Sequence, residues 1–309
     1  MNIDVASIGS RIHQGLKRIL RTAPSRAIEM PSPCLHCGCR FAFPFAGSCS
    51  PDFDVAQLPP SVAASLTLKN NGTCCCCGLL QAYRRPTFDE LKIINKFGKD
   101  ASTSDPAYSD KNAIANSIEK FRNNHINERL QKWGSFFSNL SIKPRRALFL
   151  RHFFGDTAVF IKDRFGCEIY GADMSKTCRD YVSTNCSNLH LLDGEINGHL
   201  SGPLIETGPY DAIFSWHVLT HACDVHGMLS QIDKLLSPGG FFLMTQEVGV
   251  KSHNPFHMMH LGEIQLKMLL AEHFNGFHVI DDCNSHAPHF IRIATPRHDE
   301  ADYIVWKRQ

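Results

Sequence analysis

The stretch GPYDAIFSWHVLTHACDVHGMLSQIDKLLSPGGFFLMTQE, residues 208–247, contains the pattern that decides the fold. Apolar runs at 210–216 and 241–247 indicate two strands, and the segment at 225–236 between them indicates a helix. Near-continuous apolar strands separated by helices are typical of a mainly parallel sheet that helices cover on both faces. The stretch therefore predicts an α/β fold.

The same alternation extends outward from this stretch. We expect further strands at 147–150, 168–173, 189–193 and 277–282, a helix at 262–273 and a closing edge strand at 303–308. Together these elements predict one α/β domain over residues 141–309. Ligands of such sheets bind at the carboxyl ends of the strands, near the point where the strand order reverses.

Composition limits the class of protein. The chain has 309 residues, of which 43% are hydrophobic and 20% charged, and its formal net charge is +2. This length accommodates one full-size domain and a smaller one. A near-neutral charge gives no electrostatic support for a nucleic-acid binder. Because we find no apolar run of membrane-spanning length and no signal-peptide core at the N-terminus, we expect a cytoplasmic protein.

The N-terminal part divides into three segments. Residues 1–30 predict a basic amphipathic helix, which either packs on the body of the protein or makes a weak membrane-surface contact. Residues 31–86 are loop-rich and carry most of the cysteines, which indicates a metal module. Residues 87–140 predict a helical linker.

Thirteen cysteines are many for this length, and eight of them lie between Cys34 and Cys77. An odd number of cysteines, clustered in C-x-x-C pairs, favours reduced thiols that bind a metal over a disulfide framework. Two C-x-x-C-G units are present, at 34–38 and 74–78. Each unit can bring two sulfur atoms to one ion, and its glycine permits the positive φ of a tight turn.

The second glycine also selects the ligands within the run of four cysteines. Gly78 makes Cys77 the second ligand of its pair and Cys74 the first, so the two cysteines between them lie inside the turn. With Cys34 and Cys37 they predict a closed four-thiolate site, which suits structural Zn²⁺. An iron–sulfur cluster takes the same four ligands, and free thiols without a metal are the remaining alternative.

The stretch at 208–247 resembles the core of class I S-adenosylmethionine-dependent methyltransferases. It carries Asp211 on its first strand, then HVLTH at 217–221 and LLSPGG at 235–240. These correspond, in order, to the family's strand Asp, its hVLeH segment and its LLkPGG turn. The resemblance implies a Rossmann-like sheet that binds S-adenosylmethionine, here preceded by a small zinc-ribbon-like module and the helical linker.

The resemblance also implies cofactor-binding residues. In EIYGADMS, Asp173 would accept hydrogen bonds from the ribose hydroxyls, with Met174 beside it. In LLDGEI, Glu195, or as a second choice Asp193, would meet the adenine amino group. The other implied cofactor contacts are Gly155, Trp216 and His217.

The first loop departs from the family pattern. The family has D-x-G-x-G-x-G there, whereas this chain has FLRHFFGD at 149–156. Only Gly155 remains, and Arg151 and Phe153 stand where glycines are expected. Bulky side chains at these positions narrow or fill the cofactor pocket. Either the cofactor binds in an altered pose, or the fold is kept without the chemistry.

A closer resemblance is to bacterial methyltransferases, including sugar C-methyltransferases, that pair a four-cysteine zinc module with this core. Their second knuckle, CxxCGLvQ, corresponds to CCCCGLLQ at 74–81. Their YHEHxxYF segment, which carries a His used as a base, corresponds to PFHMMHLGE at 255–263. This implies His260 as a catalytic base; His221 is a second candidate, and His257 fits a structural role better.

These features predict methyl transfer from S-adenosylmethionine to a small-molecule or carbohydrate-type acceptor. Two other functions stay open. The altered first loop favours a non-catalytic binding or assembly subunit. A nucleotide-sugar enzyme of another type is disfavoured, because the glycine fingerprint of such a site is missing.

Overall fold

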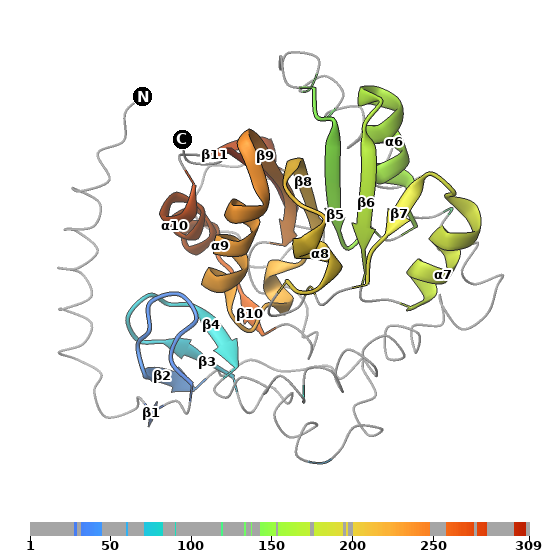
Figure 1. The fold of residues 1–309 in the computed structure, drawn as a ribbon. Helices are drawn as coiled ribbons and strands as arrows, with labels where there is room; N and C mark the ends of the chain where they lie inside the picture. The colour runs from blue at the N-terminus through green and yellow to red at the C-terminus, as the bar shows by residue number, and fades with distance from the viewer. Residues whose placement is uncertain are drawn as a thin grey trace.

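The computed structural model describes residues 28–29, 32–44, 71–82, 143–152, 154–173, 176–193, 200–247, 258–274, 277–282 and 300–306, together with residues 60, 90, 119, 133, 137 and 196. Its described strands form two sheets (Figure 1). The larger sheet has seven strands and the smaller has five. No described helix is long and apolar enough to cross a membrane.

The larger sheet carries the α/β fold. Its strands are, in spatial order, β11 (Phe277–Asp282), β12 (Glu300–Trp306), β9 (Leu236–Glu247), β8 (Tyr210–Trp216), β5 (Arg146–Leu150), β6 (Glu168–Ala172) and β7 (Leu189–Leu191). The five strands from β9 to β7 are parallel, and β12 is antiparallel to both of its neighbours.

The strand order reverses between β5 and β8. From β5 the chain moves outward through α6 (Asp156–Phe165), β6, α7 (Lys176–Asn185) and β7, and then returns through α8 (Pro203–Glu206) to β8 on the other side of β5. The loops that follow β5 and β8 therefore leave the sheet in opposite directions. Such a reversal opens a crevice at the carboxyl ends of the strands, where ligands of these sheets bind.

Alternate residues of the central strands pack into two cores, one on each face of the sheet. In β5, Leu148 and Leu150 face one core, whereas Ala147 and Phe149 face the other. The first core contains apolar side chains of α9 (Val225–Leu235) and α10 (Glu263–His273), and the second contains those of α6 and α7. Helices thus cover both faces of the sheet, as the continuous apolar strands predict.

The smaller sheet joins the cysteine-bearing segment to the large domain. It consists of β1 (Ile28–Glu29), β2 (Phe41–Pro44), β3 (Asn71–Cys74), β4 (Leu80–Ala82) and β10 (Met259–His260). β10 comes from the C-terminal part of the chain and pairs antiparallel with β4, with Met259 opposite Gln81. In Figure 1 the N-terminal strands lie beneath α9 and α10, next to β10.

The structure confirms the predicted order of strands and helices in the α/β part. One expectation was wrong: the strand at 303–308 was expected to close the edge of the sheet, but β12 lies between β9 and β11. β11 and β12 are antiparallel neighbours, and such a pair can join a sheet with either strand innermost. The sequence pattern does not distinguish the two arrangements.

Several expectations lie outside the described residues. They are the predicted helix up to residue 27 and most of the linker at 87–140, of which Glu90, Glu119, Trp133 and Phe137 are described as helical. Ile28–Glu29, expected at the end of the first helix, instead form β1 and pair with β2.

Gly171 of β6 offers a direct test of the packing beside the crevice. A Cβ at this position would lie 2.8 Å from Cδ2 of Leu189 and 2.9 Å from Cδ2 of His152, closer than packed atoms come. We expect Gly171→Ala to lower the free energy of unfolding by about 1–3 kcal/mol, because the His152 ring has to move. Denaturant unfolding measures this. Ser183→Ala, an exposed change in α7, is the control, and equal stability of the two variants would contradict the packing.

Candidate functional site

The carboxyl ends of three central strands bring together the candidate site. Arg151 follows β5, Asp173 follows β6, and His217 follows β8. Backbone hydrogen bonds hold these ends in register: Arg151 N donates to Ala172 O at 2.7 Å, and His217 N donates to Thr245 O at 2.9 Å. The residues thus lie at the edge of the sheet where the strand order reverses.

Asp173 lies deep in this crevice, beside His152. The side chain of Asp173 is 2% exposed and that of His152 is fully buried. Nδ1 of His152 is 3.9 Å from Oδ2 of Asp173, which is longer than a hydrogen bond. The carboxylate therefore lies near, but is not directly bonded to, the imidazole. The absence of a side chain at Gly171 gives the His152 ring its place.

Arg151 occupies a backbone conformation that glycine would favour. Its φ is 66°, in the left-handed region, and His217 shares this feature with a φ of 52°. A non-glycine residue in this region costs about 1–3 kcal/mol and is found most often at functional sites. Two such residues face the same crevice from adjacent strands, β5 and β8.

The Arg151 side chain leads toward the loop after β8. Its Nη1 donates to the carbonyl oxygen of His217 at 3.3 Å and lies 3.2 Å from Nε2 of His221. Because a guanidinium only donates hydrogen bonds, Nε2 of His221 must be the acceptor. The contact thus fixes His221 as a neutral imidazole with its proton on Nδ1.

Gly155, the glycine that remains in the first loop, ends the loop directly before α6. Its φ is 85°, and an added Cβ would lie 3.0 Å from Sγ of Cys186. Both the conformation and the close approach disfavour a larger residue.

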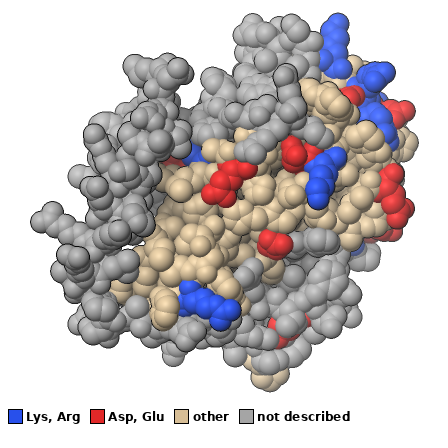
Figure 2. All heavy atoms as spheres, turned by 60° about the vertical axis from the view of Figure 1, so that its left-hand side comes forward, with Lys and Arg blue, Asp and Glu red and all other residues tan. Residues whose placement is uncertain are grey.

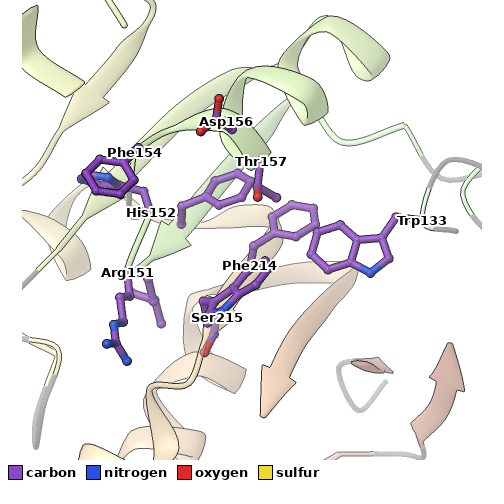
Figure 3. A pocket seen from close by; sticks show the side chains of 11 residues that line it. Trp133, Arg151, His152, Phe154, Asp156, Thr157, Phe214 and Ser215 are labelled. Atoms are coloured by element: carbon purple, nitrogen blue, oxygen red, sulfur yellow. The ribbon is translucent and has the colours of Figure 1, made fainter. Parts of the chain in front are cut away.

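Aromatic side chains fill much of the space beside the first loop. The cavity there has a volume of about 10 Å³, roughly the space for one water molecule. Figure 3 shows Phe154, Phe214 and Trp133 grouped around it, with Arg151 pointing away from them. Trp216, expected as a pocket wall, lines this cavity, and its ring lies 6.3 Å from that of Trp133.

The two candidate bases lie on neighbouring elements. His221 ends the short 3-10 helix η5 (Leu219–His221), and His260 ends β10. Met258 N donates to Thr220 O at 2.7 Å, which fixes β10 against η5. Both imidazoles are largely buried. His221 therefore contacts the first loop, whereas His260 belongs to the strand that pairs with β4 of the smaller sheet.

The remaining residues that the sequence analysis singled out are either exposed or outside the described part of the chain. Asp193 is exposed just after β7. Phe153, Met174, Glu195 and His257 lie outside the described residues.

Four cysteine sulfurs come together at the two turns that precede β2 and β4 of the smaller sheet. Sγ of Cys34 is 3.5 Å from that of Cys77, and Sγ of Cys37 is 3.5 Å from that of Cys74. All four sulfur atoms lie within 4.8 Å of one another, so they could hold one metal ion. The hydrogen bond with Cys34 lowers the pKa of Cys74 and raises that of Cys77, so the four groups cannot all be thiolates unless a cation compensates their charge.

The two C-x-x-C-G units have the same backbone geometry. Gly38 and Gly78 have φ values of 71° and 74°. In each unit the glycine N donates to the carbonyl oxygen of the first cysteine, at 2.9 and 3.0 Å. The cysteines inside the second turn face elsewhere: burial raises the pKa of both, to about 12 for Cys76, which keeps them protonated.

Two glutamines tie these turns together and to the large domain. Gln81, fully buried on β4, accepts a hydrogen bond from Leu35 N of the first turn at 2.8 Å. Gln265 of α10 donates through Nε2 to the carbonyl oxygen of Cys77 at 3.0 Å. The Gln that closes the CCCCGLLQ motif therefore links the two cysteine turns.

A protein-family model described as "Methyltransferase domain" matches residues 91–290, more than half of the chain. The chain belongs to this family. No curated protein sequence matches it significantly.

Solved structures similar to this methyltransferase-family chain share little sequence with it. The CurJ carbon methyltransferase has 17% identity and a TM-score of 0.44, covering 56% of this chain and 51% of its own. The YcgJ protein from Bacillus subtilis has 13% identity and a TM-score of 0.43, covering 58% and 99%. The plantazolicin methyltransferase BpumL, solved with a pentazolic desmethylPZN analog and SAH, has 12% identity and a TM-score of 0.48, covering 72% and 100%. The match thus spans about half the length of the CurJ chain.

Sequence reasoning missed three residues that the structure brings into these sites. The sequence pattern gives His152 no role, but the structure places it beside Asp173. It predicts that Arg151 narrows the cofactor pocket, but in the structure Arg151 also holds His221. It includes Gln81 in the CCCCGLLQ motif without a partner, and in the structure Gln81 accepts a hydrogen bond from Leu35 N. For Gln81 the sequence did offer a signal: a side-chain amide next to apolar residues is expected to be buried, and a buried amide requires hydrogen-bond partners.

Gln81 provides a test of the link between the cysteine turns. We expect Gln81→Leu to lower the free energy of unfolding by about 1–3 kcal/mol, because it leaves the Leu35 N–H buried without its acceptor. Thermal and denaturant unfolding measure the loss.

Gln231→Leu is the matched control, since Gln231 also bonds a backbone N–H, that of Leu200, but far along the chain from the cysteines. Addition of a chelator should speed the unfolding of the Gln81 variant more than that of the Gln231 variant. Identical responses would contradict a link specific to the cysteine turns.

Proposed function

We propose that this protein transfers a methyl group from S-adenosylmethionine to a small-molecule or carbohydrate-type acceptor. Membership of the methyltransferase-domain family supports the reaction class. The observation that carries the proposal is the position of Asp173, an acid at the carboxyl end of β6 beside the reversal of strand order. Ligands of such sheets bind at this place.

The adenosine side of the crevice fits the cofactor. A carboxylate accepts hydrogen bonds and donates none, which matches two ribose hydroxyl donors. Asp173 would hold the ribose, and Asp193, at the end of the neighbouring strand β7, would lie toward the adenine. Met174 and Glu195 are further candidates on the sequence pattern alone.

The cofactor would supply an electrophilic methyl group, and the residues of the chain would position and deprotonate the acceptor. Arg151 holds the carbonyl of His217 and Nε2 of His221, which fixes the loop after β8. With Nε2 occupied in this way, His221 is suited to positioning. His260 is then the better candidate for the base, because an imidazole can accept a proton near neutral pH.

The four-cysteine site would bind structural Zn²⁺. Four thiolates leave no open position for a substrate, so such an ion stabilises the fold and does not take part in catalysis. Its structural effect would extend to His260, because β4, next to the second turn, pairs with β10.

A non-catalytic role is the second candidate, and one observation favours it. The cavity beside the first loop has room for about one water molecule, whereas ligand pockets commonly have volumes of about 300–1,000 Å³. If the aromatic side chains keep these positions, the methionine part of the cofactor does not fit there.

Calorimetric titration with S-adenosylmethionine and S-adenosylhomocysteine separates the two functions. We expect both to bind, and Asp173→Asn to weaken their binding about 10- to 100-fold, because hydrogen bonds to a charged group contribute about 1.5–3 kcal/mol. Asp180→Asn, an exposed change in α7, should leave the affinity unchanged.

Two results would count against this assignment. Absence of binding at millimolar concentration for either compound removes the basis for the methyltransferase proposal and favours the non-catalytic role. Equal affinity of the Asp173 variant and the wild type would refute the ribose assignment alone.

Metal analysis of two neighbouring variants tests the zinc site. We expect Cys74→Ser to lose the ion, because its sulfur belongs to the four-sulfur group, and Cys75→Ser to keep it. Inductively coupled plasma mass spectrometry gives the metal content. Equal loss in both variants would overturn the choice of ligands, and iron in place of zinc would overturn the choice of metal.

A further inference from the structure

A second group of metal-ligating side chains lies where the helices meet the first cysteine turn. His226 stands in the first turn of α9, and Glu272 and His273 stand in the last turn of α10. Nδ1 of His226 is 3.0 Å from Nε2 of His273 and 3.6 Å from Oε2 of Glu272. One nitrogen or oxygen atom from each residue lies within 4.8 Å of the others. Three ligand atoms from two helices therefore converge on one point.

The other ring nitrogen of His226 shows how this side chain is oriented. Its Nε2 lies 3.1 Å from the carbonyl oxygen of His36, in the first cysteine turn. A carbonyl oxygen only accepts hydrogen bonds, so Nε2 carries the proton and a neutral His226 directs its Nδ1 lone pair toward Glu272 and His273. Metal-binding histidines have this arrangement, with the second nitrogen donating to a backbone carbonyl.

The ring of His226 is held in place from a second direction. The His36 ring stacks on it, with the two planes 6° apart and the centroids 6.3 Å apart. The side chains of His226 and Glu272 are 34% and 49% exposed. The group is thus oriented by the protein on one side and open to water on the other.

The electrostatics of the group favour a cation. Nδ1 of His226 is an acceptor, and Oε2 of Glu272, 3.6 Å away, is another. Without a metal, an N–H at Nε2 of His273 would donate to Nδ1 of His226 at 3.0 Å. A metal ion bound by all three residues would replace that proton and offset the charge of the carboxylate. Figure 2 shows that the described charged side chains on the visible face of the molecule are of both signs and scattered.

We propose that His226, Glu272 and His273 form a second metal site, which binds Zn²⁺ or a similar first-row divalent ion. Two imidazoles and one carboxylate suit Zn²⁺, with water in the remaining position. Mg²⁺ and Ca²⁺ prefer oxygen ligands throughout and suit the group poorly. The ion would fasten α9 to α10 and, through the His36 carbonyl, the helices to the first cysteine turn.

Metal content of the full-length protein tests this site independently of any methyltransferase activity. After chelator treatment and reloading with Zn²⁺, we expect about two ions per chain in the wild type, from one four-ligand and one three-ligand site. His226→Asn and His273→Asn should each retain about one ion per chain. Their affinity for the second ion should fall at least about tenfold, because even the loss of a residue that only supports a metal ligand lowers metal affinity by about 10- to 100-fold. His190→Ala, an exposed histidine on β7, is the control and should retain both.

Cobalt substitution identifies which site is filled. Co²⁺ at the cysteines gives intense thiolate charge-transfer bands, whereas Co²⁺ at the second site gives only weak ligand-field bands, which the His226 and His273 variants should lack. Circular dichroism checks that these variants are folded. A wild type that binds only the cysteine-bound ion would overturn the proposal, as would a second ion that remains unaffected in both histidine variants. The first of these results would mean that the hydrogen bond between Nε2 of His273 and Nδ1 of His226 holds the group together without a metal.

Discussion

The backbone pairing of β4 with β10 is the interaction on which the arrangement of this molecule depends. It joins a strand directly after the second cysteine turn to a strand more than 170 residues later in the chain. The pairing makes the cysteine module and the α/β domain share one sheet, and their apolar side chains also share one core, in which Cys34, Leu35 and Leu79 pack with residues of α9 and α10. The folded cysteine module therefore stabilises β10 through backbone hydrogen bonds and α9 and α10 through apolar packing.

This connection gives the cysteine site a role beyond the stability of its own turns. His260 lies opposite Leu80, two residues after Gly78. The same turn is held from the other side by Gln265 of α10. Loss of the turn geometry would thus remove a partner from both β10 and α10, and β10 in turn lies against η5, which carries His221. The chain places its candidate bases where the two parts of the molecule meet.

The sequence predicted the α/β elements well, because the spacing of apolar residues along a helix or strand is a local property of the sequence. The strands at 210–216 and 277–282 and the helices around 225–236 and 262–273 were correct nearly to the residue. The relation between distant segments was not predictable: nothing in PFHMMHLGE indicates that Met259 pairs with Gln81. The four cysteines of the two C-x-x-C-G units do bring their sulfur atoms within 4.8 Å of one another, and the choice of these four as metal ligands stays a prediction.

The first loop shows why a residue pattern and a backbone geometry are separate constraints. The sequence shows arginine where the family has glycine, which predicts either an altered pose of the cofactor or a fold kept without the chemistry. In the structure Arg151 nevertheless adopts the left-handed conformation that a glycine would supply at low cost. Its two hydrogen bonds to the loop after β8 help to offset the strain, and they draw the long side chain away from Phe154 and Phe214 (Figure 3). At this one position Arg151 therefore supplies the backbone conformation that a glycine favours. Arg151 lines the small cavity beside the loop together with aromatic rings, among them those of Phe154 and Phe214. The positions of these side chains would therefore decide whether the methionine part of a cofactor fits there.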